Sequence, residues 1–271
     1  MKTDKKKIII TKEHGSWAVL FIPILTGITS TWSISVSLIL FIISTFFLFM
    51  SYTPAEIVLM NYLRKMPSGK KIVNARYWMT LFLTLSIAAG LPLILLMHKY
   101  LLIYFALAAL FFFFISLLIV IKYRKNVWSD LLAMVGLTIS APAAIYLAEN
   151  AVSQKSVIVW ILNVLFFGSS AFYVHMKMKL TSLKKTEIPL DEKIRIGRLN
   201  IIYHIIAVLL LTAFTAVYPS KWVIILAFVP IIVHALAGTF RMPEKISFKK
   251  IGITFLVYSI FFLLCMSVSG L

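Results

Sequence analysis

Long apolar runs, separated by short polar loops that we call joints, make up almost the whole chain. Most runs hold about 20 residues or more, the length that an α-helix needs to cross a bilayer. The pattern predicts about nine membrane-spanning helices, at residues 16–31, 34–62, 78–97, 100–121, 128–147, 157–176, 199–218, 222–240 and 251–268. We therefore expect an all-α, polytopic integral membrane protein, with residues 1–271 in a single transmembrane domain and a short basic cytoplasmic tail over residues 1–14.

Positive charges gather on one side of the predicted bundle. Of the 27 lysines and arginines, only Lys99, Lys155 and Lys221 fall in joints of the other side. Because basic joints stay in the cytoplasm, the N-terminus should be cytoplasmic. A missed or extra helix would mix the two sets of joints, so the charge pattern favours nine spans in the cell membrane.

Composition agrees with a membrane protein. Hydrophobic residues make up 61% of the chain and charged residues 13%, whereas soluble domains are roughly half apolar and a quarter charged. The mean hydropathy is +0.98. The net charge of +18 follows from topology and from attraction to anionic headgroups, so the expected partners are membrane lipids and not nucleic acid. The lone Cys265 excludes an intrachain disulfide and a cysteine-ligated zinc.

Ionisable side chains inside the spans are few: Glu56, Asp130, His175, His204 and His234. A charge in hydrocarbon costs at least about 2.5 kcal/mol, so each of these residues marks a functional site by default. The direction of each span places all of them in its cytoplasmic half. We expect them to line one cytoplasm-facing cavity. The alternative is that each pairs with a neighbouring helix or reaches the interface.

The boundary of the first span adds two ionisable residues, Glu13 and His14. They could form an acid and base couple if the backbone turns after them, because histidine titrates near neutral pH. The cations Lys12, Arg64, Arg76 and Lys177 favour an anion site, although the positive-inside rule also explains most of them. No metal site is assigned, because the histidines and carboxylates lack a recognisable ligand spacing.

Three stretches resemble the YwiC-like family of bacterial membrane proteins. They are EHGSWAVLFIP at residues 13–23, the basic joint 64–76 with ARYW at residues 75–78, and FYV at residues 172–174. The resemblance extends over nearly the whole chain. It implies a membrane protein of a family without an assigned activity.

A more distant similarity is to the UbiA superfamily of prenyltransferases. It rests on nine helices with an internal N-terminus, on Pro23 and Gly27 in the first span, on long cytoplasmic joints after the second and sixth spans, and on RKMPSG at residues 64–69. The similarity implies a UbiA-like bundle in which two aspartate-rich motifs hold magnesium, and the magnesium binds an isoprenoid diphosphate.

The two motif regions differ from that pattern. The first offers Glu56 and Asn61, and the second, residues 173–177, contains no carboxylate. Magnesium needs hard oxygen ligands, mostly carboxylates, so the cofactor stays unassigned. His175 or Lys177 could supply the countercharge of a diphosphate instead.

Our first hypothesis is a cavity that binds an amphipathic anionic ligand, either an isoprenoid diphosphate or a quinone-like molecule. If the protein is an enzyme, it would be a prenyltransferase-like transferase. The expected catalytic residues are Glu13, His14 and Glu56, and the expected ligand-binding residues are Asn61, Arg64, Arg76, Tyr173, His175, Lys177 and His204. The alternatives are a small-anion or metabolite transporter, and a non-enzymatic membrane subunit that docks through the joint 177–198.

Overall fold

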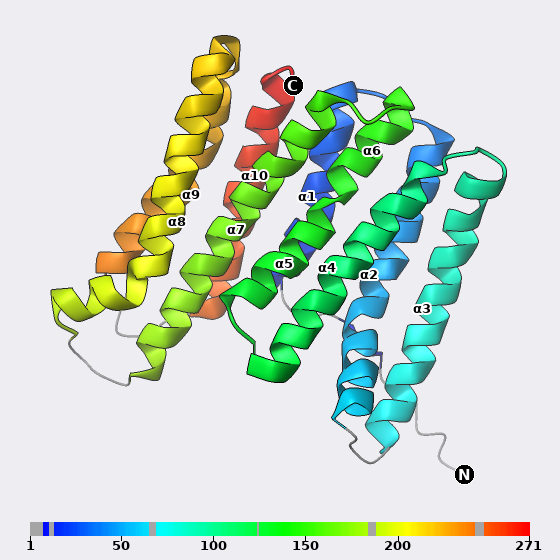
Figure 1. The fold of residues 1–271 in the computed structure, drawn as a ribbon, viewed down its shortest axis with the longest axis horizontal. Coiled ribbons are helices and arrows are strands. Elements are labelled where there is room, and N and C mark those ends of the chain that lie inside the picture. Colours follow the sequence, from blue (N-terminus) through cyan, green and yellow to red (C-terminus); the bar gives the residue numbers. More distant parts are fainter. Residues whose placement is uncertain (1–7, 11–13, 65–68, 124, 184–187, 242–246) are drawn as a thin grey trace.

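Helices make up most of the described part of the chain, and the rest of it forms turns and short connections (Figure 1). The computed structural model describes residues 8–10, 14–64, 69–123, 125–183, 188–241 and 247–271. Its helices are α1 (His14–Thr31), α2 (Val36–Leu63), α3 (Lys70–Leu95), α4 (Leu101–Tyr123), α5 (Val127–Thr138), α6 (Ser140–Glu149), α7 (Gln154–Ser182), α8 (Leu190–Val217), the 3-10 turn η1 (Pro219–Lys221), α9 (Val223–Phe240) and α10 (Phe248–Val268).

Eight helical segments among the described residues are long and apolar enough to cross a membrane. The helices α5 and α6 count together as one of them, Val127–Glu149. The apolar part of α1, Gly15–Thr31, is shorter. The protein is therefore a multi-pass helical membrane protein, while the ninth span and the cytoplasmic N-terminus stay predictions.

The break between α5 and α6 falls at Ile139, inside a predicted continuous span. Proline has no backbone N–H, and its ring collides with the carbonyl group four residues earlier. Pro142 stands four residues after Thr138, where α5 ends. The proline therefore accounts for a break in an otherwise single transmembrane rod.

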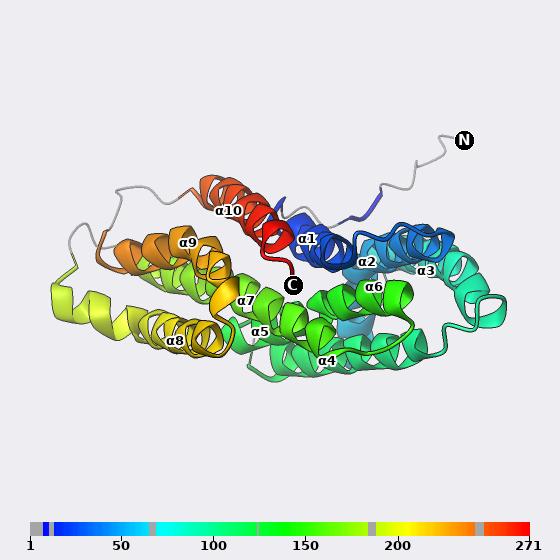
Figure 2. The same cartoon turned by 90° about the horizontal axis from the view of Figure 1, so that it is seen from above.

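The helices form an elongated, flattened bundle (Figures 1 and 2). The α2–α3 pair lies at one end of the long axis, and α8 and α9 lie at the other. Seen from above, α1 and α10 lie on one face of α6 and α7, and α4 and α8 lie on the opposite face (Figure 2). Helix α1 contacts α5, α6, α7 and α10, so it joins the two halves of the molecule.

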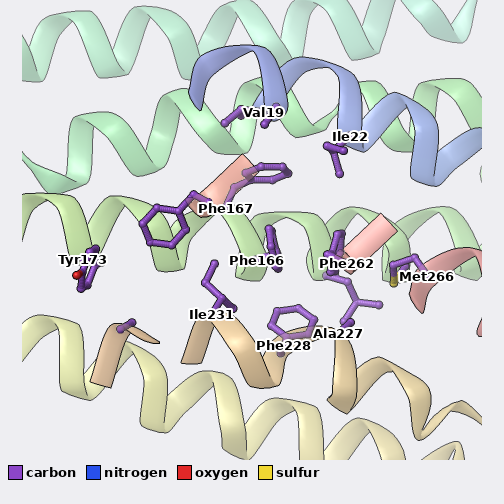
Figure 3. Close-up of a cluster of buried hydrophobic side chains, with 14 of the residues drawn as sticks. Val19, Ile22, Phe166, Phe167, Tyr173, Ala227, Phe228, Ile231, Phe262 and Met266 are labelled. Atoms are coloured by element: carbon purple, nitrogen blue, oxygen red, sulfur yellow. The ribbon is translucent and has the colours of Figure 1, made fainter. Parts of the chain in front are cut away.

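Aromatic packing fills the centre between α7, α9 and α10 (Figure 3). The Phe166 and Phe262 rings stack with 4.3 Å between their centroids, and the Phe228 ring meets both edge-on. All three side chains are buried. Because lipid also solvates apolar groups, this cluster stabilises the bundle through close van der Waals packing more than through escape from water.

Small residues let α1 approach α6 closely. A Cβ atom added at Gly27 would lie 2.6 Å from the carbonyl oxygen of Ala141 and 2.9 Å from the Cβ atom of Ala144. Small residues at such crossings bring helix backbones together in membranes. Glycine is thus required here by space, since Gly27 has an ordinary helical backbone.

Several helix ends meet at one end of the bundle, which we call the basic end. Here α2 ends beside Arg64, α3 begins at Lys70, and α9 ends beside Arg241. The lower part of Figure 1 shows these ends together with the C-terminal end of α7. The two cavities described below both include basic residues from this end.

Candidate functional site

A cavity of about 660 Å³ lies near the basic end, between α1, α2, α3, α4 and α5. We call it the carboxylate cavity, because Glu56 of α2 and Asp130 of α5 line it. Its other lining residues are Ile8, Ile9, Ile10, Ser16, Val19, Phe49, Tyr52, Thr53, Ile57, Lys71, Asn74, Ser116, Val120, Lys125, Ala133, Met134 and Leu137. Its volume lies within the range of small-molecule sites, about 300–1,000 Å³.

Asp130 reaches this cavity from the first turn of α5. Asn126 caps that helix, since its side-chain oxygen accepts hydrogen bonds from the backbone N–H groups of Trp128 and Ser129. The N-terminus of a helix carries a partial positive charge, which suits a carboxylate in the first turn. The local sequence therefore fixes where this carboxylate lies.

His175 of α7 supports Asp130 from outside the cavity wall. Its Nε2–H donates a hydrogen bond of 2.8 Å to Asp130 Oδ2, and Lys125 Nζ lies 3.8 Å from Asp130 Oδ1. The side chain of His175 is 11% exposed and that of Asp130 is 26% exposed, so the carboxylate is the more accessible partner. A paired imidazole and carboxylate can orient each other and transfer a proton. A ligand in the cavity would meet the pair through Asp130.

Among the described residues, the charged side chains that line the carboxylate cavity balance. Glu56 and Asp130 contribute two negative charges, and Lys71 and Lys125 contribute two positive charges. Asn74 adds an amide on the α3 side. The described part of the lining can therefore donate and accept hydrogen bonds without a net formal charge.

A second cavity, of about 680 Å³, lies between α7, α9 and α10. We call it the histidine cavity, after His234 of α9. Its other lining residues are Tyr173, Lys177, Val229, Pro230, Val233, Ala237, Gly238, Arg241 and Tyr258. No described residue lines both cavities.

Lys177 is the buried cation of the histidine cavity, with 2% of its surface exposed. Its ammonium group donates to the carbonyl oxygens of Gly238 at 2.6 Å and Arg241 at 3.0 Å, at the C-terminal end of α9. It also lies 5.4 Å from the centre of the Tyr173 ring. Cations near a helix C-terminus satisfy free carbonyl groups there. Lys177 thus ties α9 to α7.

His234 lies among aromatic rings in the same cavity. The centres of the Tyr173 and Tyr258 rings are 5.1 Å and 5.6 Å from its imidazole. The Tyr258 hydroxyl lies 3.3 Å from His234 Nδ1. The other ring nitrogen, Nε2, is buried and has no hydrogen-bond partner within the described residues. Such an unsatisfied atom calls for an explanation, and a bound ligand is one.

The predicted site residues do not gather in one place. Glu56 lines the carboxylate cavity and His175 supports its wall, whereas Tyr173 and Lys177 line the histidine cavity. His204 lies elsewhere and is fully buried.

Both ring nitrogens of His204 are used by the protein. Its Nδ1–H donates to the carbonyl oxygen of Asn200 at 2.7 Å, so Nε2 accepts the hydrogen bond of the Ser169 hydroxyl at 2.6 Å. The arrangement joins α7 to α8. His204 therefore serves packing between helices in this structure.

The remaining predicted residues lie outside both cavities or outside the described part of the chain. Arg64 and Arg76 are exposed, Asn61 is half-buried, and none of these three lines a cavity. Glu13 lies outside the described residues. The backbone of His14 begins α1, but its side chain is also outside the described part.

Sequence analysis missed Lys71, Asn74 and Lys125 as cavity residues. It placed Lys71 and Asn74 in a polar joint, whereas α3 includes both and brings them to the same cavity. Their spacing of three residues, which puts side chains on one face of a helix, was the available signal. Among the described residues, no group of three or more histidine, cysteine, aspartate or glutamate side chains could hold a metal ion.

Comparison with known proteins places the chain in a family. The sequence matches the family model described as YwiC-like protein over residues 10–145, which is half of the chain. An uncharacterised protein of Haemophilus influenzae is 22% identical over 260 residues, covering 95% of this chain and 97% of the relative. No solved structure matches. The matched half includes Glu56, Asp130 and nearly all other residues that line the carboxylate cavity. Because the family model matches half of the chain, this protein belongs to the YwiC-like family.

Proposed function

We propose that this membrane protein binds an amphipathic ligand of the isoprenoid or quinone type in the carboxylate cavity. The observation that carries the proposal is the division of the cavity lining. Glu56 and Asp130 lie near the basic end, while Phe49, Met134 and Leu137 lie up to two helical turns deeper along α2 and α5. A polar head beside the carboxylates and an apolar tail along the deeper side chains would match this division.

Charge balance favours a ligand with an uncharged head over a bare diphosphate. The described part of the lining already holds two lysines and two carboxylates, so a diphosphate would add negative charge beside Glu56 and Asp130. A quinone or hydroxylated ring offers carbonyl acceptors to the lysines and hydroxyl donors to the carboxylates. The quinone-type ligand is therefore the form of the proposal that the lining supports best.

A transferase of the UbiA type is the enzymatic form of the proposal. In that form an isoprenoid diphosphate would give its prenyl group to the hydroxyl oxygen of an acceptor, diphosphate would leave, and Asp130 would accept the hydroxyl proton. His175 would act as a positioning residue through its 2.8 Å hydrogen bond. We assign no step to a metal ion. The basic end would face the cytoplasm, as the positive-inside rule predicts for the cell membrane.

Thermal unfolding of the purified full-length protein tests the proposal. The probes are a short-chain ubiquinone, and farnesyl diphosphate with and without Mg²⁺. We expect the quinone to raise Tm in wild type and to have little effect on Asp130→Asn, because the variant loses the carboxylate that meets the head. Asp191→Asn is the matched control, since Asp191 is also in the first turn of a helix but is exposed and lines neither cavity.

Native mass spectrometry of the untreated protein provides the second measurement. A co-purifying isoprenoid or quinone that is lost in Asp130→Asn and kept in Asp191→Asn supports the site. If no probe raises Tm in wild type and no such molecule co-purifies, the ligand proposal is wrong. Stabilisation by farnesyl diphosphate with Mg²⁺ alone would favour the metal-dependent activity of the UbiA similarity.

The Asp130–His175 pair also supports a second candidate, a proton-coupled transporter of a small anion or metabolite. Paired ionisable residues within membrane spans often belong to proton relays and substrate pathways. This candidate predicts uptake by proteoliposomes when a pH gradient is imposed, and its loss in Asp130→Asn. Uptake that does not respond to the gradient would contradict the candidate.

A further inference from the structure

The histidine cavity differs from the carboxylate cavity in its charge. It contains the cations Lys177 and Arg241, and no aspartate or glutamate is among the described residues that line it. Within the described part of the chain, no carboxylate lies within 4.0 Å of either cation. The cavity therefore suits an anion.

Lys177 has more N–H donors than the described residues around it have hydrogen-bond acceptors for them. An ammonium group has three N–H donors, and Lys177 directs two of them to the carbonyl oxygens of Gly238 and Arg241. The third donor has no oxygen or nitrogen acceptor among the described residues, although the ammonium group also lies 5.4 Å from the centre of the Tyr173 ring. Lys177 is 2% exposed, so bulk water does not supply that acceptor.

A second donor, the Nε2–H group of His234, lies deeper in the membrane. His234 is four residues before Gly238, about 6 Å deeper along α9 at 1.5 Å per residue. When the Tyr258 hydroxyl donates to His234 Nδ1, the buried Nε2 carries the hydrogen and has no acceptor among the described residues. A ligand that extends from Lys177 toward His234 should thus offer a second acceptor at this depth.

The outer wall of the cavity faces lipid. Val229 is 44% exposed and Val233 is 59% exposed, and both lie on an α9 helix that is apolar enough to span the membrane. Exposed valines on such a helix contact acyl chains. A ligand can therefore enter sideways from the bilayer, with its apolar part still in lipid.

From these observations we infer that the histidine cavity binds an acidic phospholipid. Its phosphodiester anion lies between Lys177 and Arg241, a glycerol ester carbonyl accepts from His234, and an acyl chain follows Val229 and Val233. Basic recesses between transmembrane helices at the cytoplasmic side are typical sites for anionic headgroups. The site is independent of the ligand proposed for the carboxylate cavity, because no described residue lines both cavities.

Delipidated full-length protein, supplied with defined lipids in detergent, provides the test. Native mass spectrometry counts retained lipid, and thermal unfolding compares phosphatidylglycerol, phosphatidylcholine and inorganic phosphate. The site variants are Arg241→Gln and His234→Phe, which keep Lys177 and its contacts with α9. The matched control is Lys179→Gln, because Lys179 is an exposed cation of α7 near the same end and lines neither cavity.

We expect wild type and Lys179→Gln to retain phosphatidylglycerol in preference to phosphatidylcholine. Loss of one charge-assisted hydrogen bond should weaken this binding about tenfold in Arg241→Gln. His234→Phe should weaken this binding less than Arg241→Gln does. The Tm of His234→Phe without added lipid is the control that tests whether this variant still folds. Equal retention of both lipids by wild type, or unchanged retention by both site variants, overturns the inference. If inorganic phosphate alone raises Tm as much as phosphatidylglycerol does, the site takes a free anion and the lipid assignment is wrong.

Discussion

Replacing Gly27 by alanine should push α1 away from α6 and destabilise the bundle. The new Cβ atom would lie 2.6 Å from the carbonyl oxygen of Ala141 and 2.9 Å from the Cβ atom of Ala144. Neither neighbour is a flexible side-chain end, so a backbone must move. Overpacking of this kind costs about 1–3 kcal/mol, and alanine recovers up to about 1 kcal/mol through its higher helix propensity. The two effects together lower the free energy of unfolding by up to about 3 kcal/mol, and we expect a value near the middle of that range, about 1–2 kcal/mol.

Equilibrium unfolding in mixed detergent micelles, followed by circular dichroism, measures this change. Gly252→Ala is the matched control, since Gly252 also lies in a helix and the nearest neighbour of its added Cβ atom, Gly15 N, is 4.0 Å away. The control should be as stable as wild type or slightly more stable, because alanine restricts the unfolded chain. If Gly27→Ala proves as stable as this control, close packing of α1 on α6 does not hold the bundle together.

Two further substitutions use the same unfolding assay. Thr26→Val removes the hydroxyl that accepts a 2.9 Å hydrogen bond from fully buried Asn163. It should cost about 1–2 kcal/mol, because the amide nitrogen loses one of its two acceptors and keeps only the carbonyl oxygen of Val159. A double variant with Asn163→Leu should recover part of this loss, and no recovery would argue against the polar contact as the cause. Phe166→Ala should cost about 3 kcal/mol, at the low end for buried aromatic residues, because lipid already solvates the ring in the unfolded state. Phe111→Ala, at a side chain that is 59% exposed, should cost much less, and equal losses would contradict the assigned core.

Hydropathy located the spans well but not the helix ends. The predicted span 78–97 corresponds to α3, which begins eight residues earlier at Lys70, and the span 157–176 corresponds to α7, which continues to Ser182. Apolar composition marks the hydrocarbon boundary, whereas helical hydrogen bonds continue through polar residues beyond it. The break at Ile139 had a local signal in Pro142 that a search for long apolar runs does not detect.

The sequence singled out ionisable residues but could not determine their partners. Tyr173 and Lys177 are four positions apart and share a face of α7, while His175 lies about 200° around the helix from Tyr173. One face meets α9 and the other meets α5, so helix α7 separates residues that we expected in one cavity. This helical spacing did not enter the prediction of one shared cavity, and that prediction was therefore wrong for His175. The contact of His175 with Asp130 depends on how α5 packs against α7, which a single sequence does not reveal.

The position of α1 sets an order for assembly in the membrane. Helix α1 packs against α10, and the buried cluster of Figure 3 combines Val19 and Ile22 of α1 with Phe262 and Met266 of α10. Because synthesis runs from α1 toward α10, this cluster can close only after α10 has been inserted. Until then α1 relies on α5, α6 and α7 for its place. A chain shortened before α10 would therefore insert most of its helices and still leave one side of α1 exposed to lipid.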